Sequence, residues 1–229
     1  MSKAKSTGAG ASRPARRSFT EEQVVDIALR LLDEGGAGAL SIRAVASALG
    51  VNPNAVYTYV ASRADLERAV IERVLSAVAL EPLRSGDVEW ADAVIGFALG
   101  LRAQLFAHPA VAMLMMSGPM DGPAASDVGE AMFGCLARGG LSEAQQAHGV
   151  YAVIVQVLGA IALTVAETDA KPPLTPESER IAQRREGLAL LDVDRWPRTA
   201  AQVDAMAAWN SEDQFVWGLR ALLTGIAAG

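Results

Sequence analysis

The sequence predicts an all-α protein with a small N-terminal and a larger C-terminal set of helices. Hydrophobic residues make up 51% of the chain but aromatic residues only 5%, which is typical of helices rich in alanine and leucine. Apolar residues recur at helical spacing, for example at Ile42, Val45, Ala46 and Leu49. Alternating runs of β-branched residues, which would indicate strands, are almost absent.

Composition limits the classes of protein to consider. The single cysteine, Cys135, excludes an intramolecular disulfide framework and a cysteine-based zinc site. The first residues lack the apolar stretch of a secretory signal, so we expect a cytoplasmic protein. The formal charge of -6 divides into +2 over residues 1–80 and -8 over residues 81–229. This division favours contact with nucleic acid through the N-terminal part alone.

Residues 1–18 predict a disordered basic arm. They are mainly Ser, Ala, Gly and Pro, and they include five basic residues and no acidic residue: Lys3, Lys5, Arg13, Arg16 and Arg17. Such an arm either reaches phosphates or an adjacent minor groove, or it only keeps the chain soluble.

The first helix is expected over residues 20–34. Thr20 and Gln23 have the spacing of a capping box, in which each residue bonds the backbone of the other. Gly35 and Gly36 end the helix. We expect it to pack across the back of the next two helices and to complete a three-helix core.

Those two helices lie within residues 41–63 and are joined by a tight turn. Ser41 can cap the first of them, and Gly50 can take the left-handed conformation that ends it. Asn52 and Pro53 suit the start of the second, expected over Asn54–Tyr59. A further helix over residues 63–79 begins at Ser62, with Asp65 placed for another capping box.

Two short helices with an exposed, polar second member are typical of a helix-turn-helix. Between Gly35 and Ala64 the chain has no Asp or Glu, and an acid there would repel phosphate. The alternative is an ordinary helical hairpin of a soluble protein. We place a DNA-binding domain over residues 19–80, a linker at 83–87, and a ligand-binding and dimerisation domain over residues 87–229.

The C-terminal region predicts longer apolar helices separated by Gly and Pro. The expected helices cover residues 88–107, 109–117, 124–138, 142–167, 199–208 and 211–227. Residues 168–198 are rich in Pro and charge, so we expect a long loop with one or two helical turns near 176–190. Loops of this length are often lids.

The segment Gly149–Ala166 has eighteen residues without a charge, so a membrane span must be considered. Gln156 and Thr164 within it, and the lack of basic or aromatic anchors beside it, argue against a membrane. We instead expect helices 142–167 and 211–227 to form half of a four-helix bundle, which a second copy of the chain completes.

A cluster of Met and other apolar residues in this region is either ordinary core or the wall of a small-molecule pocket. Polar residues near it, including Asn210, could anchor a ligand. His108 precedes Pro109 and could instead be a helix-end residue. The candidate ligand-binding residues are Phe97, Leu101, Gln104, Leu105, His108, Met113, Met116, Met132 and Trp209. We expect no cofactor or metal.

An enzyme is a weaker interpretation. With two His, one Cys and no phosphate-binding glycine loop, the chain offers no pairing of nucleophile and base. A DNA-binding protein that needs no ligand is a third possibility.

Residues 20–75 resemble the N-terminal domain of the tetracycline-repressor (TetR) family. The matching positions are Ala28, Leu31, Leu32, Gly35 or Gly36, Leu40, Ser41, Arg43, Ala46, Gly50, Val51, Val56, Tyr57, Tyr59, Val60, Arg63 and Leu66. The family often has His where Tyr59 stands, Phe where Val60 stands and Lys where Arg63 stands. The C-terminal region resembles the ligand-binding domain of the tetracycline-repressor branch more weakly, through its Pro-rich insert, the run Leu191–Pro197 and the ending from Phe215 to Gly225.

This resemblance implies a homodimeric regulator, usually a repressor, that leaves a palindromic operator when a small molecule binds the C-terminal domain. We expect Asn54 to read adenine, Ala55 to contact a thymine methyl, and the tyrosines to contact phosphate. The branch's His and bound magnesium find no match here, so neither tetracycline nor metal is expected. The candidate DNA-binding residues are Ser41, Arg43, Asn52, Pro53, Asn54, Ala55, Tyr57, Thr58, Tyr59 and Arg63.

Overall fold

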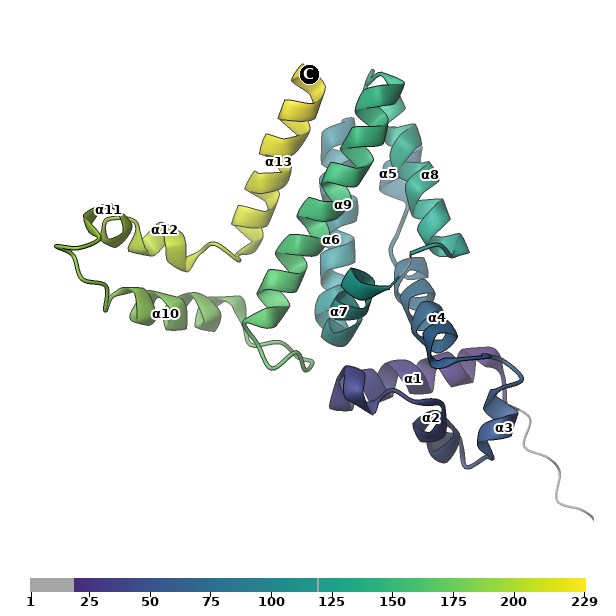
Figure 1. Ribbon diagram of the computed structural model, residues 1–229. Coiled ribbons are helices and arrows are strands. Elements are labelled where there is room, and N and C mark those ends of the chain that lie inside the picture. The colour runs from purple at the N-terminus through teal and green to yellow at the C-terminus, as the bar shows by residue number, and fades with distance from the viewer. Residues whose placement is uncertain (1–18, 119) are drawn as a thin grey trace, which may run out of the picture.

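The computed structural model describes residues 19–118 and 120–229, and this part of the chain contains helices and no strand. The all-α prediction is therefore confirmed. Residues 1–18, where we expect a basic arm, lie outside the described residues. Figure 1 shows three parts, which we call the head (α1 to α3), the body (α5 to α9 with α13) and the extension (α10 to α12). Helix α4 joins the head to the body.

The caps predicted in the head are present. Thr20 and Gln23 form the reciprocal capping box at the start of α1 (Glu21–Gly35). Ser41 Oγ accepts a hydrogen bond from the Ala44 N–H at 3.1 Å and so caps α2 (Ile42–Leu49). Gly50 adopts the left-handed conformation, with φ 70° and ψ 31°, so the chain can turn sharply there.

Helix α3 (Pro53–Val56) is shorter than the predicted Asn54–Tyr59. The Thr58 hydroxyl donates to the Ala55 carbonyl at 2.7 Å, and this carbonyl would accept from the Tyr59 N–H if the helix continued. The Tyr59 N–H bonds Val56 instead, at 2.9 Å. A polar side chain that competes for a backbone carbonyl ends the helix early.

Helix α4 (Arg63–Ser76) also ends sooner than expected, and a short helix α5 (Glu81–Ser85) replaces part of the predicted linker. Pro82 begins this helix rather than stopping one, because a proline in the first turn gives up no helical hydrogen bond. Leu83 is fully buried. The capping box predicted for α4 forms only in part, since the Asp65 carboxylate accepts from the Ser62 hydroxyl.

The body is arranged around α9 (Glu143–Ala166), which packs against α6 (Trp90–Ala107), α7 (Pro109–Ser117), α8 (Pro123–Arg138) and α13 (Glu212–Ala228). By length and composition alone α9 could cross a membrane. One of its faces is buried among these four helices. One continuous apolar core runs from the head through α4 into the body.

Within residues 168–198, the one or two helical turns expected near 176–190 form a longer helix than predicted, α10 (Glu177–Leu188). Helix α10 lies beside α12 (Val203–Ala207), and α11 (Pro197–Ala200) stands at their turn (Figure 1). Polar contacts hold this extension together, for example the ion pair between Arg185 and Asp204 at 2.8 Å. The α10 sequence lacks an apolar stripe, which is the signal that periodicity detects.

His108 lies at the corner between α6 and α7, which meet at 111°. Its Nδ1 is 2.9 Å from Asp33 Oδ2 on α1, so the pair connects the head to the body. Burial raises the pKa of the Asp33 carboxyl above its usual value, and the contact with His108 opposes this change. Asp33 Oδ1 is buried and has no hydrogen-bond partner among the described residues.

We expect His108→Ala to lower the free energy of unfolding by about 1–3 kcal/mol, because the Asp33 carboxylate would lose its hydrogen bond. Asp33→Asn should cost less, because it removes the buried charge together with the contact to His108. Urea unfolding of both variants at neutral pH measures the difference. An equal loss in the two variants would contradict the role assigned to the buried carboxylate.

Candidate nucleic-acid interface and ligand cavity

The ten residues predicted to contact DNA lie along α2 and α3, in the turns beside them and at the start of α4. Three of them, Arg43, Asn54 and Tyr57, have exposed side chains with no polar partner among the described residues. Tyr57 is 52% exposed. Pro53 and Ala55 lie beside them and are half-buried. This set combines a cation, an amide and a hydroxyl within a segment of the chain that contains no acid.

The other five residues of this prediction have polar side chains that already bond the protein. Ser41 and Asn52 use their side-chain oxygens to cap α2 and α3. The Tyr59 hydroxyl donates to the Phe19 carbonyl at 2.6 Å, with the two rings 5.1 Å apart. Arg63 bonds Glu67 at 2.8 Å and the Ala37 carbonyl at 3.0 Å, and Thr58 bonds Ala55. These contacts fix the shape of the surface.

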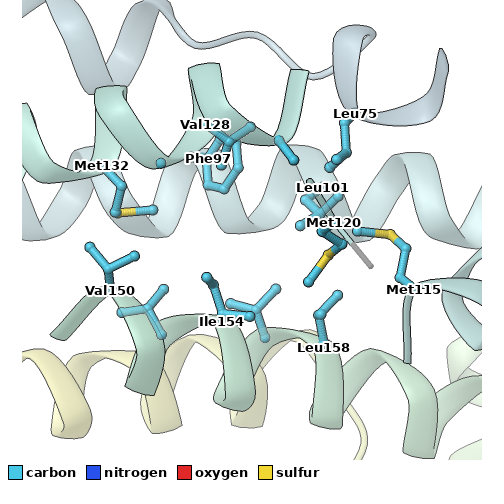
Figure 2. Close-up of a pocket in the computed structure, with 14 residues that line it drawn as sticks. Leu75, Phe97, Leu101, Met115, Met120, Val128, Met132, Val150, Ile154 and Leu158 are labelled. Atoms are coloured by element: carbon cyan, nitrogen blue, oxygen red, sulfur yellow. The ribbon is translucent and has the colours of Figure 1, made fainter. Parts of the chain in front are cut away.

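A cavity of about 130 Å³ lies inside the body. Figure 2 shows Met132 at one end and Met115 and Met120 at the other, with Leu75 reaching in from α4. Every lining residue among those that the structure describes is apolar, so these side chains offer a ligand no hydrogen bond. The lining residues are Leu75, Phe97, Leu101, Met115, Met120, Ala125, Val128, Gly129, Met132, Val150, Val153, Ile154, Val157 and Leu158.

Three of the nine predicted ligand-binding residues line this cavity: Phe97, Leu101 and Met132. The other six, which are Gln104, Leu105, His108, Met113, Met116 and Trp209, do not. Of these, Leu105 is fully buried in the core, and Met113, Met116 and Trp209 are about half exposed. His108 is bonded to Asp33.

The sequence prediction missed the wall that α9 provides. Val150, Val153, Ile154, Val157 and Leu158 follow helical spacing along one face of this helix. The sequence prediction places the whole helix in a dimer seam, although a helix that is apolar all round has two faces to bury. Counting the apolar residues on each face of this helix separately predicts both a cavity wall and a dimer seam.

Comparison with known proteins decides the family. Residues 24–70 match the family described as bacterial regulatory proteins, tetR family. Residues 81–229 match the tetracyclin repressor-like C-terminal domain. The chain belongs to the tetracycline-repressor family. This agrees with the resemblance seen in the sequence, and the family is one of transcriptional regulators rather than enzymes.

Individual relatives support this assignment. The chain is 31% identical to an HTH-type transcriptional regulator of Saccharopolyspora erythraea, over 65% of this chain and 64% of that protein. It is 25% identical to the HTH-type transcriptional repressor DrrR1 of Streptomyces coeruleorubidus, over 96% and 82%. The fold resembles that of Streptomyces coelicolor ActR, solved in complex with actinorhodin, with a TM-score of 0.78 at 24% identity, over 93% and 98% of the two chains.

Proposed function

We propose that this TetR-family protein is a cytoplasmic, homodimeric repressor that binds a palindromic operator and leaves it when an apolar molecule enters the body cavity. The observation that carries the proposal is the placement of α4. This helix packs against α1 of the head and also supplies Leu75 to the cavity wall. A change in the cavity therefore has a direct route to the surface of α2 and α3.

The second face of α9 supports the homodimer. Tyr151, Val155 and Leu163 are 71%, 52% and 63% exposed on this helix, and Trp217 on α13 is 66% exposed. Large apolar side chains gathered on two adjacent helices mark an interaction surface. A second copy related by a two-fold axis would bury them in a four-helix bundle. The two heads of such a dimer can meet half-sites about one helical turn apart.

The cavity favours an uncharged, largely apolar ligand. A charged group inside it would lose its hydration without any partner. An apolar cavity of roughly 150 Å³ holds a benzene-sized molecule, so a larger ligand must move the helices that line it. Methionines at both ends suit such adjustment, because their side chains are flexible. ActR, solved with actinorhodin, is a TetR-family relative with a bound small molecule.

The test uses the DNA that flanks the protein's own gene. Fluorescence anisotropy should detect binding to a palindrome in this DNA, and a thermal-shift screen should find neutral apolar compounds that stabilise the protein. Charged compounds of the same size are the matched control. Absence of operator binding would overturn the proposal. Operator binding that no stabilising compound weakens would favour the alternative, a DNA-binding protein without a ligand.

Two neighbouring tyrosines should respond differently to loss of their hydroxyl groups. We expect Tyr57→Phe to weaken operator binding by about 0.5–1.5 kcal/mol, because its free hydroxyl would lose a phosphate contact. Tyr59→Phe should leave operator affinity nearly unchanged and lower protein stability slightly, since its hydroxyl bonds Phe19. Anisotropy titrations and thermal unfolding of both variants separate the two effects. The reverse pattern would assign the phosphate contact to Tyr59.

A further inference from the structure

Glu72 of α4 holds the first turn of α8. Its Oε2 accepts a hydrogen bond from the Ala124 N–H at 2.6 Å, and its Oε1 accepts from the Ala125 N–H at 3.3 Å. Amides in the first turn of a helix have no partner within that helix, and a carboxylate there also meets the positive end of the helix dipole. The side chain therefore acts as a cap supplied by a different helix.

Gly122, just before α8, leaves room for the Glu72 carboxylate because it has no Cβ atom. A Cβ atom placed on Gly122 would lie 2.2 Å from Glu72 Cδ, so any other residue there would collide with it. Nearby, Arg68 of α4 pairs with Asp121 at 2.9 Å on the more exposed side. These contacts join α4 to the start of α8. We call the four residues around the Glu72 carboxylate the Glu72 clasp: Glu72, Gly122, Ala124 and Ala125.

The clasp adjoins the cavity. Ala125, whose N–H the carboxylate holds, lines the cavity, and so does Leu75, which follows Glu72 by three residues on α4. Helix α8 also lines the cavity with Val128, Gly129 and Met132. In Figure 2 the side chains of Leu75 and Met120 lie at the same end of the cavity.

We infer that Glu72 is the positioning residue through which a filled cavity moves the head, an inference that rests on the proposed function. A molecule larger than the cavity must displace a wall. Helix α8 is a wall whose first turn the Glu72 carboxylate holds. Its displacement pulls α4, which packs against α1 of the head, and so changes the spacing of the two heads.

The experiment replaces the unidentified ligand by a side chain of the protein. Gly129 lies on the cavity-lining face of α8, and a Cβ there meets nothing within 4 Å. Gly129→Phe overfills the cavity from within, and Gly129→Ala is the matched control that fits. If the phenylalanine variant does not fold, as judged by thermal unfolding, Gly129→Leu takes its place. The readout is the operator dissociation constant.

With Glu72 present, we expect Gly129→Phe to raise the operator dissociation constant by about tenfold or more, within the usual range of coupling between sites. Glu72→Ala alone should leave it within about threefold. In the double variant, the Gly129→Phe effect should shrink to less than about threefold. Asp121→Asn, which breaks the neighbouring ion pair but spares the clasp, should retain the full effect. If Glu72 had only a structural role, Gly129→Phe would raise the operator dissociation constant by the same factor with and without the Glu72 side chain.

The outcomes separate the two proposals. An unchanged Gly129→Phe effect in the Glu72→Ala background would overturn the clasp and leave ligand-driven release standing. The lack of any Gly129→Phe effect with Glu72 present would overturn both the clasp and the link between cavity and operator.

Discussion

Leu163→Arg should leave the protein monomeric and raise its operator dissociation constant by about 10²–10⁴-fold, because one head then binds without the second. Leu163 is 63% exposed on the outer face of α9, beside other exposed apolar side chains. A guanidinium at this position would be buried without a partner in the four-helix bundle, which is strongly unfavourable. The cavity lies on the other face of the helix and should be unaffected.

Size-exclusion chromatography with light scattering measures the oligomeric state, and anisotropy measures operator binding. Val88→Arg is the matched control, since Val88 is similarly exposed at 52% but lies outside α9 and α13. We expect this control to remain a dimer with full operator affinity. A Leu163→Arg protein that still elutes as a dimer would show that the seam lies elsewhere.

Arg43→Ala should weaken operator binding by about 1–3 kcal/mol, the usual cost of losing an arginine contact to a base or phosphate. Its side chain is exposed and has no partner within the described residues, so thermal stability should not change. Adding Tyr57→Ala should weaken binding further. Anisotropy titrations at several salt concentrations check the result, because a lost phosphate contact also lowers the salt dependence of binding.

Arg30→Ala is the control for this effect. Arg30 is also an exposed arginine of the head, but it lies on α1 and pairs with Glu34 at 3.0 Å. If Arg30→Ala weakened operator binding as much as Arg43→Ala, the contribution would come from general positive charge and not from the surface of α2 and α3.

The head could be predicted closely from sequence because its signals are local. Thr20, Ser41, Gly50 and Asn52 each act on residues within a few positions along the chain, so a cap or a left-handed turn is visible in the sequence. The end of α3 was missed because Thr58 bonds a carbonyl instead of continuing the helix. The length of α10 was underestimated because its sequence lacks an apolar stripe, and its contacts to α12 include polar ones such as the Arg185–Asp204 pair.

The cavity could be predicted only in part because its walls come from five helices far apart in sequence. Phe97, Leu101 and Met132 are among the predicted ligand-binding residues, but Leu75 lies on α4, outside the C-terminal region in which we sought the pocket. The Glu72 clasp has no sequence signal, since a cap is recognised only when it stands beside its own helix. The pairing of His108 with Asp33 likewise depends on how the head sits on the body.

The most direct test of the central claim compares operator affinity with and without a bound compound. The compound is the neutral apolar molecule that raises the thermal unfolding temperature most, added at saturation at one fixed salt concentration. We predict that the operator dissociation constant rises by about tenfold or more while light scattering still shows a dimer. An operator dissociation constant that stays the same with the compound bound would contradict release through the cavity.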